Sequence, residues 1–258
     1  MSALALTYHA VERGPSPLCV DPKRFADQLD LIVETGVRTV TVSELAADLR
    51  NGRIAERTLA LTFDDGAASV ARTAAPLLLE RGLVATVFCV AGHLGGRNDW
   101  RSQPAWAARI DLAAADELAT LARLGFEIGS HGMEHVPLTA ATPESVLRRE
   151  LHDSRRTLEE ALGVEVGSFA YPYNVRSRDA RRAAVEAGYR AACAGSLALV
   201  GRAADPLAIP RVDAYYLEWP PLFRMALAGS PQWYLAIRRA GAAARRLLRK
   251  DYVPRSRG

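Results

Sequence analysis

The stretch TLALTFDDG, residues 58–66, decides how this chain is organised. Its first six residues are β-branched, apolar or aromatic, as in a short buried strand, and two carboxylates and a glycine follow. Because side chains alternate along a strand, Asp64 and Asp65 leave the strand end in different directions. One carboxylate can then bind a metal while the other moves a proton. Alone, the stretch is equally typical of a strand that enters an Asp-Gly hairpin turn.

Strand and helix patterns alternate along the rest of the chain. Strands are predicted at 3–8, 37–42, 58–63, 83–90, 126–129, 166–170, 189–193 and 207–212, and helices after 21 and at 43–50, 67–81, 111–124, 142–162 and 179–187. Asp21, Ser43 and Asp111 are the expected N-caps of three of these helices. The alternation predicts an α/β fold with a parallel sheet or barrel, in which chemistry collects where the strands end.

Residues 91–109 form the longest predicted loop, with three glycines and two tryptophans. Long ordered loops tend to be functional. Trp100 and Trp106 can stack on sugar rings or pack this loop onto the barrel, and the sequence favours neither.

Two histidines, His131 and His135, follow the strand predicted at 126–129. On a helical turn their spacing places both imidazoles on one face, where both can ligate one ion. Most such pairs are surface residues. A carboxylate from another strand end would complete three protein ligands around an open position, which is the pattern of a catalytic metal site. Nitrogen and oxygen ligands suit Zn²⁺, with Co²⁺, Ni²⁺, Mn²⁺ and Fe²⁺ as alternatives.

Three motifs follow one another along the chain: TFDDG at 62–66, SHGMEH at 130–135 and FAYPY at 169–173. In sequence and in order they resemble the motifs of the polysaccharide deacetylases, the NodB-homology family also called carbohydrate esterase family 4. The resemblance covers roughly residues 1–213. It implies a distorted (β/α) barrel, usually of seven strands, and a metal-dependent hydrolase that removes the N-acetyl group of an aminosugar.

The resemblance also implies roles for single residues. Asp65, His131 and His135 would hold the metal, and Asp64 would be the general base that takes a proton from water. The backbone N–H of Tyr173 would stabilise the oxyanion that forms when the amide carbonyl is attacked.

The general acid departs from the usual family pattern. Many members have an acid histidine in a late motif, but this chain has no histidine after His152. Residues 6–11, LTYHAV, resemble the Y-H-x-V start of the subgroup that deacetylates poly-N-acetylglucosamine during exopolysaccharide synthesis. In that subgroup the acid histidine lies at this early position, so His9 is the predicted acid.

The third motif departs in a second way. Many members have arginine where this chain has Ala170, and Arg211 is predicted to supply that guanidinium to the base. Tyr171, Pro172 and Arg211 are the expected substrate-binding residues. Asp213 is a candidate to support a metal ligand or the acid histidine.

Composition is that of an ordinary globular protein, with 49% hydrophobic and 24% charged residues in 258. The three cysteines, Cys19, Cys89 and Cys193, lie far apart, which argues against a disulfide framework and against a cysteine zinc site. The N-terminal residues lack the basic start and long apolar core of a signal peptide. These features predict a cytoplasmic protein with reduced thiols.

Charge is distributed unevenly. Residues 219–258 hold nine Lys/Arg and one acidic residue, or +8, so the first 218 residues carry +4 − 8 = −4. We therefore expect a catalytic domain at 1–218 and a basic helical tail at 219–258. A helical projection of 233–250 separates basic residues (Arg238, Arg239, Arg245, Arg246, Arg249, Lys250) from apolar ones (Trp233, Ile237, Ala240, Ala244, Leu247).

Such a helix either packs on the barrel or lies on an anionic membrane, which would make the protein peripheral to the inner face of that membrane. No motif that reads nucleic acid is present, so no nucleic-acid partner is expected. The predicted substrate is an N-acetylated saccharide or a lipid-linked sugar. Two alternatives remain: a deformylase or deacetylase of a lipid-linked aminosugar, and a catalytically silent module that binds glycan or membrane. A pure binder has no need of Asp64, Asp65 and both histidines.

Overall fold

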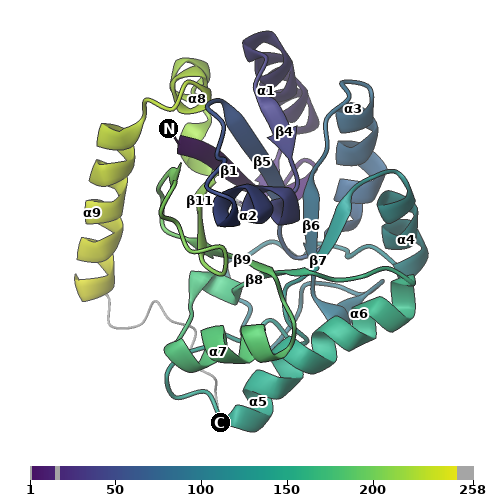
Figure 1. Cartoon of the computed structure of the whole chain (residues 1–258). Helices are drawn as coiled ribbons and strands as arrows, with labels where there is room; N and C mark the ends of the chain where they lie inside the picture. Colours follow the sequence, from purple (N-terminus) through teal and green to yellow (C-terminus); the bar gives the residue numbers. More distant parts are fainter. Residues whose placement is uncertain (1, 15–17, 249–258) are drawn as a thin grey trace.

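The computed structural model describes residues 2–14 and 18–248, and side chains as far as Gly241 (Figure 1). Among these residues, seven parallel strands close a barrel, in the order β1, β11, β9, β8, β7, β6, β5 and back to β1. Their bounds are β1 Ser2–Tyr8, β5 Thr58–Phe63, β6 Thr86–Cys89, β7 Glu127–Ser130, β8 Ser168–Ala170, β9 Ala191–Gly195 and β11 Ile209–Asp213. The predicted (β/α) barrel is confirmed.

Strand register aligns the chemical groups at one end of the barrel. Leu6 of β1 pairs with Leu61 of β5 on one side and with Val212 of β11 on the other. Tyr8 pairs with Phe63 in the same ladder, so the residues that follow them, His9 and Asp64, leave the sheet side by side. All residues of β5 and β6 are buried, as expected for strands enclosed on both faces.

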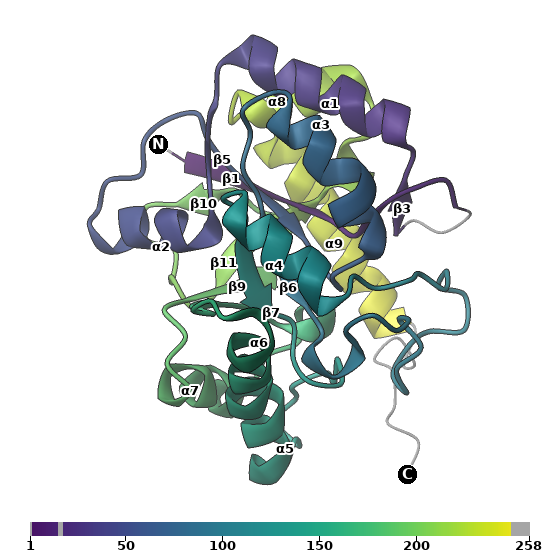
Figure 2. The same ribbon diagram turned by 90° about the vertical axis from the view of Figure 1, so that its right-hand side faces the viewer.

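Helices surround the barrel (Figures 1 and 2). They are α1 Pro22–Thr35, α2 Val42–Arg50, α3 Ala75–Leu79, α4 Ala115–Arg123, α5 Glu144–Arg148, α6 Ser154–Leu162, α7 Arg178–Glu186, α8 Pro220–Leu227 and α9 Gln232–Leu248. A π-helical turn, Val70–Ala74, precedes α3, and a second one, η3 Arg149–Asp153, joins α5 to α6. None of the described helices combines the length and the apolar character needed to cross a bilayer.

Short elements complete the structure. β2 Ala10–Val11 pairs with β3 Cys19–Val20, β4 Arg38–Val40 lies beside β5, and β10 Val200–Gly201 runs antiparallel to β1. The 3₁₀ turns are Ala91–His93, η4 Pro172–Asn174 and η5 Ala214–Leu217. The sequence prediction missed β2, β3 and β10, because two-residue strands leave no periodic signal.

Two predicted N-caps are wrong, and one is confirmed. Asp21 accepts a hydrogen bond from the backbone of Lys23 at the start of α1, as expected. Thr41, rather than Ser43, caps α2, because Glu44 completes a capping box with it. Asp111 forms an ion pair with Arg97, and α4 begins only at Ala115.

The C-terminal helices lie outside the barrel. The apolar face of α8 (Leu222, Phe223, Ala226 and Leu227) joins the main hydrophobic core. α9 follows and runs along one side of the molecule (Figures 1 and 2). The division of the chain at residue 218 stays a prediction. The expected basic residues Arg249 and Lys250 lie outside the described residues, as do the side chains of Arg245 and Arg246.

Candidate metal centre and active site

Three predicted metal ligands converge at the carboxyl ends of β5 and β7. His131 Nε2 lies 3.6 Å from Asp65 Oδ1, and His135 Nε2 lies 3.5 Å from the same oxygen. The two Nε2 atoms are 3.2 Å apart. All three side chains are buried, and among the described residues they form the one His/Cys/Asp/Glu group compact enough to hold an ion.

These separations fit a divalent cation. Ligand atoms about 2.0–2.1 Å from a tetrahedral ion lie about 3.3–3.4 Å from one another. The ring of His131 is also set for ligation, because its Nδ1 lies 2.8 Å from the carbonyl oxygen of Ala170. A carbonyl only accepts, so Nδ1 carries the proton and Nε2 presents its lone pair to the site.

His135 is held between aromatic rings. Its ring centroid is 4.4 Å from that of Trp100 and 4.5 Å from that of Tyr173. The hydroxyl of Ser102 donates to the backbone carbonyl of His135 at 2.8 Å. The backbone of His135 has a positive φ of 55°. Burial, reinforced by His131, lowers the pKa of His135 well below its usual value and keeps the ring neutral, which is the form that ligates metal.

Trp100 is therefore a packing residue of the site. Its side chain is only 3% exposed, whereas Trp106 in the same loop is 57% exposed. Of the two alternatives that the sequence left open for Trp100, the structure shows packing: the ring holds the loop over the metal group. Nδ1 of His135 has no hydrogen-bond partner among the described residues.

A buried carboxylate that the sequence analysis did not single out holds the histidine loop. Glu150 of η3 is 1% exposed and accepts from the backbone N–H groups of Met133 and Glu134 at 3.1 Å, with a longer contact to Val136 at 3.5 Å. Gly132 makes this approach possible, because its φ is +90° and an added Cβ would lie 2.5 Å from Glu150 Oε2. Glu150 thus fixes the turn between the two histidines.

Asp64, the first aspartate of the DDG motif, has a different environment from Asp65. Asp64 lies beside the metal group, with Oδ2 3.9 Å from His131 Nε2. Arg211 donates from Nη1 to Asp64 Oδ1 and from Nη2 to Oδ2, both at 2.7 Å. Burial would raise the pKa of Asp64, but the charge of Arg211, helped by His131, outweighs it and brings the pKa to about 2. Asp64 is therefore ionised at neutral pH and has no metal-ligand duty in this arrangement.

The structure pairs Arg211 with Asp64, as the sequence analysis expected. Arg211 is 2% exposed, and Nη1 also donates to Thr62 Oγ1 at 3.1 Å. Its guanidinium is enclosed beside Asp64 and leaves little surface for substrate, so the contacts favour positioning of Asp64. The substrate-binding role of Arg211 stays a prediction.

His9 lies on the other side of the carboxylates. It follows β1 directly and is partly buried. Burial raises the pKa of Asp65, and the electrostatic effect of His9 is the largest of those that oppose this rise. Burial likewise raises the pKa of Asp213, and His9 again opposes it. His9 is thus electrostatically coupled to both carboxyl groups.

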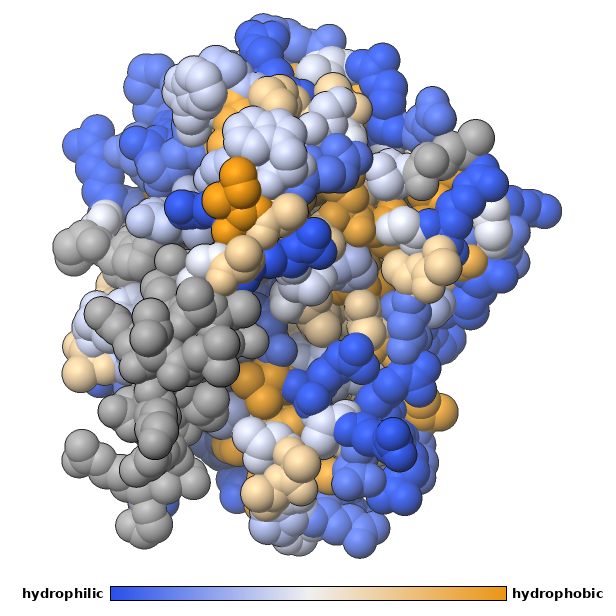
Figure 3. Space-filling view, turned by 90° about the vertical axis from the view of Figure 1, so that its left-hand side faces the viewer, coloured by the Kyte–Doolittle hydropathy of each residue, from blue (hydrophilic) through white to orange (hydrophobic). Residues whose placement is uncertain are grey.

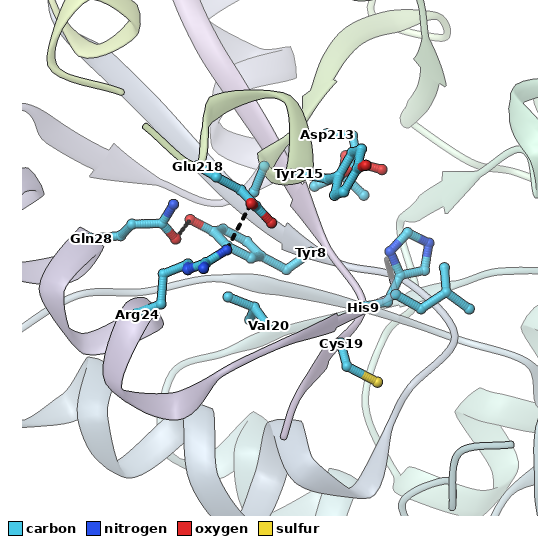
Figure 4. A pocket seen from close by; sticks show the side chains of 12 residues that line it. Tyr8, His9, Cys19, Val20, Arg24, Gln28, Asp213, Tyr215 and Glu218 are labelled. Carbon is cyan, nitrogen blue, oxygen red and sulfur yellow. Dashed lines mark hydrogen bonds and ion pairs between the residues drawn. The ribbon is translucent and has the colours of Figure 1, made fainter. Parts of the chain in front are cut away.

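Figure 4 shows the small cavity beside His9, of about 20 Å³, which is room for roughly one water molecule. Tyr8 points across it and donates to Gln28 at 3.0 Å, and Arg24 pairs with Glu218 at 2.8 Å on its rim. Asp213 lines the same cavity and accepts from the backbone N–H of Tyr215.

The third motif forms the turn that presents Tyr173. Tyr171 has no exposed surface, packs on Phe169 with 5.2 Å between ring centroids, and has its pKa raised to about 12 by burial. Pro172 is buried too. The ring of Tyr171 is part of the core and is closed to substrate. The expected substrate-binding role of Tyr171 and Pro172 stays a prediction. Tyr173 has a positive φ of 55°, and its hydroxyl donates to the carbonyl of Ser102 at 2.8 Å.

Comparison with known proteins agrees with this site. The family profile described as polysaccharide deacetylase matches residues 51–192, more than half of the chain. YxkH of Bacillus subtilis, named as a polysaccharide deacetylase, is 25% identical over 186 residues, which cover 72% of this chain and 61% of YxkH. The poly-β-1,6-N-acetyl-D-glucosamine N-deacetylase of Staphylococcus aureus (strain MRSA252) is 22% identical over 201 residues, covering 69% and 67%. The chain thus spans about three fifths to two thirds of the length of these relatives.

Solved structures show the same fold. IcaB from Ammonifex degensii superposes with a TM-score of 0.73 and 25% identity, over 88% of this chain and 96% of that one. The Streptococcus pyogenes deacetylase PplD, solved in complex with acetate, has a TM-score of 0.71 and 22% identity, over 83% and 92%. With three motifs in order, a closed seven-stranded barrel and a buried Asp-His-His group at its mouth, this chain belongs to the polysaccharide deacetylase family.

Proposed function

We propose that this protein hydrolyses the N-acetyl group of an aminosugar in a glycan, with acetate and a free amine as products. The observation that carries the proposal is the buried group of Asp65, His131 and His135 with the Arg211-paired carboxylate of Asp64 beside it. The relatives named as deacetylases of poly-β-1,6-N-acetyl-D-glucosamine make a β-1,6-linked N-acetylglucosamine chain the first substrate to test.

The three ligands would hold one divalent cation. We propose Zn²⁺, because two histidine nitrogens and one carboxylate oxygen at this spacing suit that ion. A cation in this position supplies Lewis-acid chemistry, lowering the pKa of water and polarising the amide carbonyl. Co²⁺, Ni²⁺, Mn²⁺ and Fe²⁺ accept the same donors and are the alternatives.

The protein's own groups carry the protons. Asp64, ionised and oriented by Arg211, accepts a proton from the attacking water. The backbone N–H of Tyr173, presented by the η4 turn, donates to the oxygen that becomes negative when the acetyl carbonyl is attacked. His9 then gives a proton to the sugar nitrogen as the C–N bond breaks, so the amine leaves neutral and acetate remains.

The direct test is acetate release from β-1,6-linked N-acetylglucosamine oligosaccharides by the full chain, with chitin oligosaccharides as a comparison substrate. Formate release from an N-formylated sugar is measured in parallel to test the deformylase alternative. Asp64→Asn should retain bound metal and lose turnover by at least about 100-fold. His131→Ala should lose both metal and turnover. If Asp64→Asn turns over normally, Asp64 is not the base; if the metal-loaded protein releases acetate from none of these substrates, the proposed activity is wrong.

A matched control separates His9 from general damage to the site. His9→Gln removes the acid but keeps a polar side chain of similar size, and metal content should not change. Its turnover should fall less for a substrate with a good leaving group, such as an acetylated aromatic amine, than for the glycan. An equal fall for both substrates contradicts the role of His9 as general acid.

A further inference from the structure

The first turns of α9 present an unpartnered apolar stripe to the outside of the molecule. Trp233 is 59% exposed and Ile237 is 61% exposed, and Ala236 and Ala240 are exposed as well. These positions follow the i, i+3, i+4, i+7 spacing that places side chains on one helix face. Figure 3 faces this side of the protein and shows hydrophobic side chains at the surface among hydrophilic ones.

The opposite face of α9 attaches the helix to the barrel. Leu235 is 2% exposed, and the hydroxyl of Tyr234 donates to the carbonyl of Tyr216 in η5 at 2.7 Å. The guanidinium of Arg238 lies over the ring of Tyr216 at 4.6 Å and that of Tyr234 at 5.7 Å. Because these contacts use one face, they fix the other, apolar face pointing away from the barrel. The packing alternative that the sequence left open is therefore not the one the described part of α9 adopts.

Charge indicates what this face meets. The segment 219–258 carries nine Lys/Arg and one acidic residue, against a net −4 for the rest of the chain. Arg239 is exposed on α9 itself. An aliphatic and tryptophan stripe on a strongly cationic helix matches the headgroup region of an anionic bilayer, where apolar side chains enter the acyl boundary and arginines meet lipid phosphates. A second copy of this helix would bring like charges together, and a glycan would offer no negative charge.

We propose that α9 is a peripheral membrane-docking helix that binds anionic phospholipid through Trp233, Ile237 and Arg239. Docking places the helix in the plane of the interface without crossing the bilayer, in keeping with its length and composition. η5 follows β11 directly and holds α9 through Tyr216. A membrane bound by α9 would therefore have a fixed orientation relative to the mouth of the barrel. The proposal stands whether or not the enzyme deacetylates the glycan proposed above.

The test is flotation of the full-length chain with vesicles of phosphatidylcholine and phosphatidylglycerol, against vesicles of phosphatidylcholine alone. The double variant Trp233→Ser/Ile237→Ser should bind the anionic vesicles at least about tenfold more weakly. Arg239→Glu should weaken binding at low salt, and raising NaCl to about 0.5 M should weaken binding of the wild type. Both variants should retain acetate release, since the substituted residues lie outside the proposed site.

Matched controls come from helices on other parts of the surface. Leu124→Ser/Val185→Ser removes two side chains of comparable exposure, 48% and 50%, and Arg123→Glu reverses an exposed charge on α4. Both controls should float like the wild type. Equal binding to neutral and anionic vesicles, or a double variant that floats like the wild type, overturns the proposal. It is also overturned if the double variant loses affinity for N-acetylglucosamine oligosaccharides and not for vesicles.

Discussion

Replacing Arg211 by methionine should destabilise the metal-free protein and slow turnover, while leaving metal binding intact. Methionine keeps most of the aliphatic stem, whose guanidinium end lies 5.5 Å from the centre of the Phe88 ring. It removes both donors that hold Asp64 at 2.7 Å. The substitution therefore tests the pairing more directly than alanine, which would also leave a cavity.

Two estimates of the magnitude agree. Removing one partner of a buried ion pair leaves an uncompensated charge and typically costs about 3–5 kcal/mol. The pKa of Asp64 is about 2 in the folded protein, against about 3.9 in an unfolded chain, which corresponds to roughly 2–3 kcal/mol at pH 7. Both figures describe the same interaction and are not added. We expect a loss of about 3 kcal/mol in the free energy of unfolding.

The pH dependence follows from the direction of the shift. In the wild type the folded pKa of Asp64 lies below the unfolded one, so its stabilisation is complete above about pH 4 and is lost as pH falls through about 2. In Arg211→Met, burial is no longer opposed by Arg211, and the pKa of Asp64 rises. The variant should therefore approach the wild type in stability as the pH falls from 7 to 4. The acid limb of its kcat/KM profile should move to higher pH.

Denaturant unfolding after treatment with EDTA measures the first effect, at pH 7 and at pH 4. Combining Asp64→Asn with Arg211→Met should recover part of the lost stability, because no charge is then left unpaired. Metal content after reloading serves as the control for the neighbouring ligands. A loss that is the same at both pH values, or a double variant no more stable than Arg211→Met alone, refutes the pairing as the cause.

Three further predictions concern other parts of the site. Glu150→Gln keeps the size of the side chain but places an amide N–H group where the backbone N–H donors need an acceptor, so metal affinity should fall about 10–100-fold by calorimetric titration. Glu160→Gln, at an exposed position of the adjoining α6, should leave metal affinity unchanged. Similar losses for both would argue against loop positioning. Tyr8→Phe leaves the buried acceptor of Gln28 unpaired and should cost about 1–3 kcal/mol in denaturant unfolding; a change below about 0.3 kcal/mol would contradict the hydrogen bond. Zinc at about 100 times its Kd should raise the thermal midpoint of the metal-free protein by roughly 5–10 °C and leave His131→Ala unmoved, and an equal rise in both would place the metal elsewhere.

Strand positions could be predicted from the sequence because buried parallel strands leave short apolar runs. The runs predicted at 58–63, 126–129 and 166–170 all became barrel strands, with every bound within two residues of its expected place. Helix starts were less secure, since several polar residues near a start compete as caps. Thr41 and Glu44 have the spacing of a capping box, a signal that outweighs the single hydroxyl of Ser43.

The site was predicted where a motif or a strand end pointed to it. Arg211 could be proposed because Ala170 stands where many family members have arginine, and Arg211, in the last predicted strand, can supply that guanidinium. Glu150 was missed because it stands among charged residues, although it lies three residues after Leu147 and beside Leu151, on the face that becomes buried. A lone carboxylate on an apolar helix face was the available signal. The burial of Tyr171 could not be read from the motif, since its hydroxyl donates to the carbonyl of Leu207 at 3.4 Å, a partner that only the fold brings near.

The opposite environments of the two adjacent aspartates give a physical reason for their division of labour. Burial raises the pKa of Asp65 with no arginine in contact, so its charged form needs a cation nearby. His135 beside it, whose pKa burial lowers, offers a ligand and no compensating charge. The negative charge of Asp64 is already compensated by Arg211, so a second cation would stabilise that charge little further. Taken alone, this difference would place a proton on Asp65 rather than on Asp64. A cation held at Asp65 would displace that proton, and Asp64 would remain as the ionised carboxylate that can accept a proton from water.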